Sequence, residues 1–86
     1  MVMGTRILAV EDDERIRMAV KMALEDEGWS VEEAASGEDA IESFTRLPAD
    51  VVLIDIMLPG IDGFELCRTL RKSSDVPIEE IGRAHV

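Results

Sequence analysis

Short apolar runs alternate with helically spaced apolar residues along this chain of 86 residues. The continuous runs at residues 6–10 and 51–54 are typical of strands buried on both faces of a parallel sheet. Residues 30–35 contain one large apolar residue, Val31, and this predicts an edge strand. A further strand is predicted to begin at residues 76–78.

Three stretches between these runs have apolar residues at helical spacing. The first is predicted to begin after Asp13, an N-cap residue, and to end before Gly28. Residues 36–39 resemble a capping box that opens the second helix, and the third helix is predicted at residues 64–72. The predicted buried positions are Ala40, Ile41, Phe44 and Leu47 in the second helix, and Phe64, Cys67 and Leu70 in the third.

Alternating strands and helices predict an α/β fold with a doubly wound parallel sheet. The carboxyl ends of parallel strands meet at one edge, where such sheets bind ligands. If the first and third strands are neighbours, Glu11, Asp12 and Asp55 converge at that edge. Three carboxylates would repel one another without a cation, and their oxygens suit Mg²⁺. In the alternative interpretation, Glu11 and Asp13 are only favourable charges at a helix N-terminus.

Composition indicates which kinds of partner the chain can bind and in which cellular compartment it works. Nine basic and nineteen acidic residues give a net charge of −10, which disfavours direct nucleic-acid binding by these residues. The single cysteine, Cys67, cannot form an internal disulfide and fits a reducing compartment. No apolar run approaches the roughly 20 residues of a membrane span, and no signal peptide precedes the first strand. We therefore expect a cytoplasmic chain without a membrane partner.

Residues 7–13 and 52–63 together resemble the receiver domain of two-component response regulators. This resemblance implies a flavodoxin-like fold with strand order 2-1-3-4-5. It also implies that a sensor histidine kinase transfers a phosphoryl group to Asp55. Asp12 would coordinate Mg²⁺ directly, Glu11 would act mostly through water, and the backbone carbonyl of Met57 would be a further ligand.

The same resemblance implies a regulatory phosphoacceptor rather than an enzyme. Its expected partners are a histidine kinase, an output domain that binds DNA to regulate transcription, and a second receiver in a homodimer. One rival interpretation is a Mg²⁺-dependent phosphohydrolase, but such enzymes typically have a second Asp where this chain has Met57. The other rival is a receiver-like interaction module that works without phosphorylation.

The end of the sequence departs from the family pattern. We expect residues 1–78 to be the N-terminal part of a receiver domain and residues 79–86 to be a tail outside the family. Glu79 and Glu80 are poorly suited to a central parallel strand. Residues 80–86 also resemble one reading frame of a sequencing adapter, so we expect an artefactual tail. The family's phosphate-binding Ser or Thr and its Lys are not found in the chain, so we expect impaired phosphorylation of these 86 residues alone.

Overall fold

The computed structural model describes residues 5–55 and 63–81. Strands and helices alternate along these residues, as the sequence predicts. The elements are β1 (Arg6–Val10), α1 (Glu14–Asp26), β2 (Ser30–Ala34), α2 (Gly37–Arg46), β3 (Val51–Asp55), α3 (Gly63–Arg71) and β4 (Ile78–Ile81).

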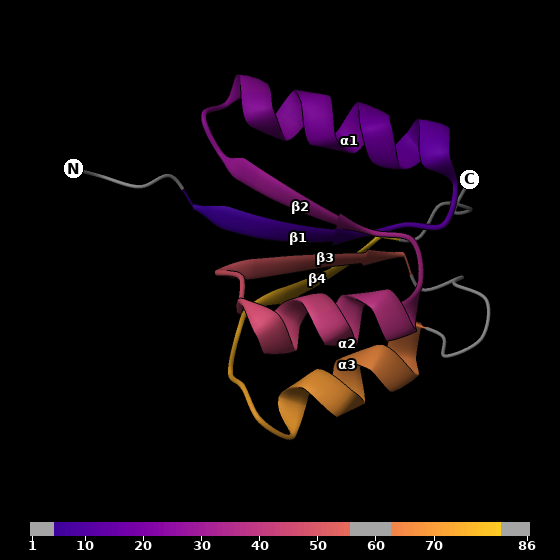
Figure 1. The fold of residues 1–86 in the computed structure, drawn as a ribbon, viewed down its shortest axis with the longest axis vertical. Helices are drawn as coiled ribbons and strands as arrows, with labels where there is room; N and C mark the ends of the chain where they lie inside the picture. Colours follow the sequence, from indigo (N-terminus) through magenta and orange to yellow (C-terminus); the bar gives the residue numbers. More distant parts are fainter. Residues whose placement is uncertain (1–4, 56–62, 82–86) are drawn as a thin grey trace.

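All four strands form one parallel sheet in the order β2-β1-β3-β4. Helix α1 covers one face of the sheet, and α2 and α3 cover the other (Figure 1). This order confirms that residues 30–34 form an edge strand and that the first and third strands are neighbours. The carboxyl ends of β1 and β3 therefore lie side by side.

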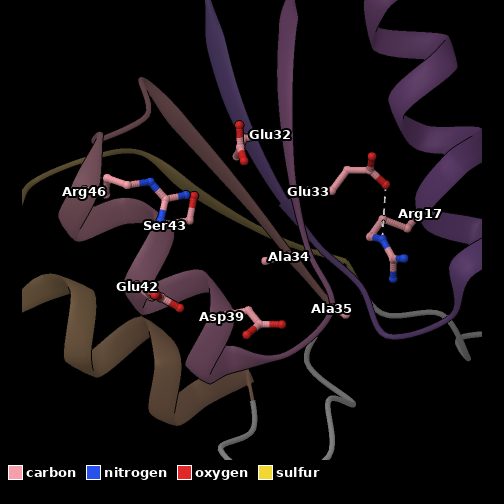
Figure 2. Close-up of a pocket in the computed structure, with 9 residues that line it drawn as sticks. All are labelled: Arg17, Glu32, Glu33, Ala34, Ala35, Asp39, Glu42, Ser43 and Arg46. Carbon is pink, nitrogen blue, oxygen red and sulfur yellow. Dashed lines mark hydrogen bonds and ion pairs between the residues drawn. The ribbon is translucent and has the colours of Figure 1, made fainter.

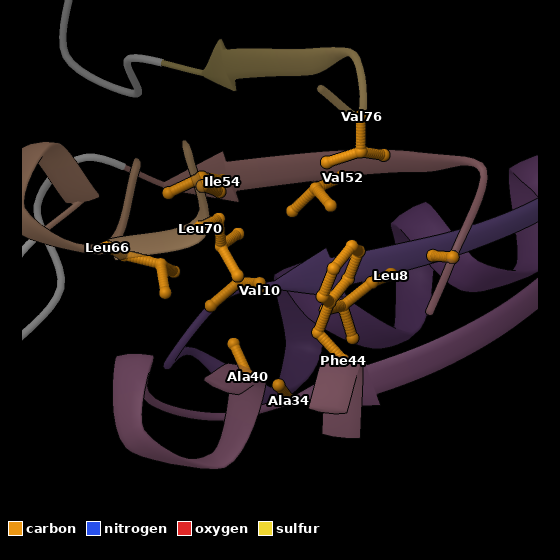
Figure 3. Packing of buried hydrophobic residues seen from close by; sticks show 11 residues of the cluster. Leu8, Val10, Ala34, Ala40, Phe44, Val52, Ile54, Leu66, Leu70 and Val76 are labelled. Atoms are coloured by element: carbon orange, nitrogen blue, oxygen red, sulfur yellow. The ribbon is translucent and has the colours of Figure 1, made fainter. Parts of the chain in front are cut away.

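The main core lies between the sheet and the pair α2 and α3 (Figure 3). Phe44 of α2 is 7% exposed, and Leu66 of α3 is fully buried. Both lie against the alternate residues of β1 and β3 that point to this face, and these are Leu8, Val10, Val52 and Ile54. Burying side chains of this size contributes about 1.5–3 kcal/mol each, which makes this layer the main source of stability.

The predicted ends of α1 and the predicted start of α2 are confirmed. Asp13 caps α1, because its Oδ1 accepts hydrogen bonds from the backbone N–H groups of Arg15 and Ile16 at 2.9 and 3.2 Å. Ser36 caps α2 through a 3.1 Å bond from the backbone N–H of Asp39. Gly28 has φ +91°, and the bonds that follow α1 are those of a Schellman motif.

Two predicted core positions are wrong. Leu47 is 54% exposed because α2 ends at Arg46, and the extended backbone of Leu47 takes its side chain off the buried face of the helix. Phe64 is also 54% exposed, whereas Leu66 is fully buried. Leu66 and Leu70 are one helical turn apart, and Phe64 lies on a different side of α3.

The sequence predicts that the residues after 78 cannot make a central parallel strand, and the strand found there lies at the edge of the described sheet. β4 extends to Ile81 and pairs in parallel with β3, with Glu79 opposite Leu53. The objection to charged residues applies to a central strand with both faces covered. Within the described residues β4 is an edge strand, and Glu79 is exposed there. The predicted domain boundary at residue 78 stays a prediction.

Helix α1 packs on its side of the sheet less completely than α2 does. None of its residues is buried, and Ile16, Met18 and Met22 are 38%, 51% and 61% exposed. Beneath it, Ile7 and Ala9 of β1 are only 3% and 2% exposed. No helix within residues 5–55 and 63–81 is long and apolar enough to cross a membrane.

Candidate functional site

The loop after β1 holds a buried carboxylate at the carboxyl edge of the sheet. Glu11 is 8% exposed, and its Oε2 accepts a 3.0 Å hydrogen bond from the backbone N–H of Asp13. Its own backbone N–H donates to the carbonyl of Ala34 on β2 at 3.0 Å. Its carbonyl accepts a 2.8 Å bond from Nη1 of Arg17 on α1. Three elements thus fix the main chain and side chain of Glu11 at this edge.

The three consecutive acidic residues of this loop have different surroundings. Asp12 is exposed, next to the buried Glu11. Asp13 is half-buried, and its carboxylate caps α1 as described above. The alternative interpretation of this loop as a helix start is therefore confirmed for Asp13. It does not account for the burial of Glu11, which lies before the cap.

Asp55 is the last residue of β3. Val10 of β1 pairs with Ile54 of β3, so Glu11 and Asp55 each follow a paired residue on adjacent parallel strands. On the other side of β3, Asp55 pairs with Ile81 of β4. The predicted convergence of the two chain segments is confirmed at the level of the backbone.

The predicted ligand set is only partly within the structure's description. The side chain of Asp55 and all of Met57 lie outside the described residues. Among those that are described, no three His, Cys, Asp or Glu side chains are grouped as metal ligands are. The set of Glu11, Asp12, Asp55 and the Met57 carbonyl therefore stays a prediction.

Arg17 is a residue of this site that sequence reasoning missed. Its side chain is 16% exposed and reaches from the first turns of α1 to the carbonyl of Glu11 and the carboxylate of Glu33. The only sequence signal is its position shortly after the acidic loop, where many exposed helix residues are also basic. Arg17 reaches Glu11 and Glu33 only because α1 packs across the sheet beside β2, and this placement cannot be read from local sequence.

The family model for the response regulator receiver domain matches residues 7–83. The chain belongs to this family. The receiver family's fold, a flavodoxin-like doubly wound parallel sheet, is confirmed, because the described order β2-β1-β3-β4 is the first part of its order 2-1-3-4-5. These matches do not favour the phosphohydrolase alternative.

Two curated relatives are named transcriptional regulatory proteins. The transcriptional regulatory protein AfsQ1 of Streptomyces coelicolor is 44% identical over 72 residues, which are 84% of this chain and 32% of that protein. ResD of Bacillus subtilis, also named a transcriptional regulatory protein, is 42% identical over 74 residues, 86% of this chain and 31% of that one. The receiver chain thus spans about a third of the length of these relatives.

Solved receiver structures resemble the fold closely. The BeF₃-activated N-terminal receiver domain of Klebsiella pneumoniae RstA has a TM-score of 0.88 at 36% identity, covering 94% of this chain and 69% of that one. The response regulator TrrA of Thermotoga maritima, in complex with Mg²⁺-BeF, has a TM-score of 0.89 at 35% identity. That match covers 94% of this chain and 71% of TrrA.

Proposed function

We propose that this receiver domain accepts a phosphoryl group from a sensor histidine kinase on the carboxylate of Asp55. The observation that carries the proposal is the pairing of Val10 with Ile54, which brings Asp55 beside the loop of Glu11 and Asp12. An aspartate at the carboxyl end of a parallel strand lies where this type of sheet binds ligands. Attack by a carboxylate oxygen on phosphorus forms an acyl phosphate, and the kinase histidine leaves.

The residues present suit Mg²⁺, with Asp12, Asp55 and the Met57 carbonyl as ligands and Glu11 acting mostly through water. A carboxylate as buried as that of Glu11 is costly unless it has hydrogen bonds or a cation nearby. A bound Mg²⁺ would stabilise the negative charge that spreads over the phosphoryl oxygens during transfer. The bonds to the Glu11 side chain and carbonyl hold this loop in position before any ligand arrives.

The signal would pass to an output domain rather than to a substrate. AfsQ1 and ResD are named transcriptional regulatory proteins, which supports an output domain that binds DNA. The net charge of −10 makes direct nucleic-acid contact by these 86 residues unfavourable. We further propose a cytoplasmic location, a regulatory rather than enzymatic role, and a second receiver as a homodimer partner.

Phosphorylation by acetyl phosphate with Mg²⁺, followed by intact mass spectrometry, tests the site. We expect one added phosphoryl group on a fraction of the wild-type chains and none on Asp55→Asn. Asp75→Asn is the control for an aspartate elsewhere, because Asp75 is exposed and lies in the loop between α3 and β4. Removal of Mg²⁺ by a chelator should abolish the adduct, and Glu11→Gln or Asp12→Asn should slow its formation.

Two results would contradict the proposal. An adduct that persists in Asp55→Asn would place the acceptor elsewhere. A wild-type chain that is folded by far-UV circular dichroism, yet takes no phosphoryl group, would favour an interaction module that works without phosphorylation.

A further inference from the structure

A polar pocket of about 390 Å³ runs beside the outer edge of β2, and we call it the β2 pocket (Figure 2). The strand contributes Glu32 and Glu33, whose side chains lie on opposite faces of the sheet. Arg17 of α1 borders the pocket on one side, and residues of α2 border it on the other. The pocket shares Arg17 and Ala34 with the surroundings of Glu11, but none of the residues proposed to accept the phosphoryl group or to bind Mg²⁺ lines it.

The backbone at this edge is available for another strand. Among the strands that the structure describes, β2 bonds only to β1, through contacts such as Ser30 N–H to the Thr5 carbonyl at 2.9 Å. In a parallel ladder, alternate residues of a strand face the neighbour. Ser30 and Ala34 bond to β1, so the N–H and C=O groups of Val31 and Glu33 point to the open side. Such an edge is a template for an added extended segment.

The charges around the pocket determine which segment fits. Glu33 is already paired, with Arg17 at 3.1 Å and Lys21 at 3.4 Å. In the described part of the chain, the carboxylates of Glu32, Asp39 and Glu42 have no ion pair. A second copy of β2 would bring its own two glutamates against these carboxylates, and like charges facing each other are destabilising. A basic segment would instead be attracted.

A polar side chain of α2 also lines the pocket. Ser43 is 8% exposed as a residue and lies close to the guanidinium of Arg46 in Figure 2. Among the described residues, its hydroxyl is not one of the buried polar atoms left without a partner, so it is open to the pocket. A polar group of a bound segment could form a hydrogen bond with it.

We propose that the β2 pocket binds an extended basic peptide segment, which adds to β2 as a further strand. Its main chain bonds to the N–H and C=O groups of Val31 and Glu33. Its Lys or Arg side chains lie against Glu32, Asp39 and Glu42, and a polar group bonds to the Ser43 hydroxyl. Acidic side chains along the edge thus exclude copies of this chain and admit a strand of opposite charge.

Two fluorescent peptides of about eight residues test this proposal by fluorescence anisotropy, one alternating Lys with Val and the other Glu with Val. The Lys/Val peptide should bind, more weakly as salt is added, and the Glu/Val peptide should not. Glu42→Lys should weaken binding about tenfold or more. The matched control is Glu38→Lys, an exposed α2 residue that does not line the pocket, which should change affinity little. Ser43→Ala should weaken binding about two- to tenfold.

The strand itself is tested with Val31→Pro, which removes one N–H from the open edge and leaves the β1 bonds in place. A chain that keeps its far-UV spectrum but loses the peptide supports strand addition. If Val31→Pro fails to fold, hydrogen exchange of the wild-type chain decides: the peptide should slow exchange at the Val31 and Glu33 amides. Unchanged exchange there, equal binding of both peptides, or equal effects of Glu38→Lys and Glu42→Lys would overturn the proposal.

Discussion

Replacing Leu66 by alanine should destabilise the chain far more than replacing Phe64 on the same helix. Leu66 is fully buried on the face of α3 that packs against the sheet, whereas Phe64 is 54% exposed. Truncating a buried leucine typically costs about 2–5 kcal/mol, because the lost contacts leave a cavity. A phenylalanine contributes about 1.5–3 kcal/mol when fully buried, so one that is half-exposed should contribute about 1 kcal/mol. We expect free energies of unfolding lower by about 3 and 1 kcal/mol, respectively.

Urea unfolding followed by far-UV circular dichroism measures both losses. The midpoint should fall for Leu66→Ala while the slope with urea stays the same, because the surface exposed on unfolding hardly changes. In thermal unfolding, about 3 kcal/mol corresponds to a drop of about 12–24 °C for a domain of this size. Leu66→Met is the control for volume and should cost less than about 1.5 kcal/mol.

Equal losses for Leu66→Ala and Phe64→Ala would refute this assignment of the buried face. The two residues differ by about 200° around an α-helix, so they cannot both point into one core. A larger loss for Phe64→Ala would mean that α3 is rotated and buries Phe64, Cys67 and Leu70, as the sequence spacing alone predicts. The same urea experiment distinguishes the three results.

Three smaller perturbations test local features. Gly28→Ala should cost about 1 kcal/mol in thermal unfolding through its φ of +91° alone, since no heavy atom lies within 4 Å of the added Cβ; no loss would contradict the turn. Asp13→Ala removes two capping bonds and should lower the unfolding free energy by about 1 kcal/mol, more than Ser36→Ala, which removes one. Arg17→Met should cost about 1.5–3 kcal/mol by urea unfolding, because it removes the bonds to the Glu11 carbonyl and the Glu33 carboxylate, whereas the exposed Arg15→Met should cost little; similar losses would contradict a stabilising role for these bonds.

The strands and the helix caps could be predicted from sequence because short-range chemistry determines them, whereas the order of the strands was implied only by the family resemblance. The apolar runs that became β1 and β3 suit only doubly covered strands, and the polar residues 30–34 suit only an edge. Asp13 and Ser36 cap helices through bonds that span two or three residues, so their role needs no tertiary information. The apolar run before Asp55 likewise predicted that this residue ends a strand, as it does in β3.

The errors concern features that depend on a distant part of the chain. Leu47 continues the apolar spacing of α2, but the helix ends one residue earlier. In α3, a stripe through Phe64 and one through Leu66 both fit the spacing, and only packing against the sheet selects between them. Glu79 is poorly suited only to a central strand, so the edge strand found there in the described sheet does not contradict the sequence prediction.

Arg17 connects the two polar regions of the molecule, and its bonds indicate that they can be occupied independently. Its Nη1 holds the Glu11 carbonyl at 2.8 Å, and its Nε pairs with Glu33 at the β2 pocket. Lys21 also pairs with Glu33, so this carboxylate is already neutralised by two cations. A basic peptide should therefore contact Glu32 and Glu42 and leave the bonds from Arg17 to Glu11 and Glu33 in place. Saturating Lys/Val peptide should leave the rate of phosphorylation by acetyl phosphate unchanged, whereas a change of about fivefold or more would show coupling through Arg17.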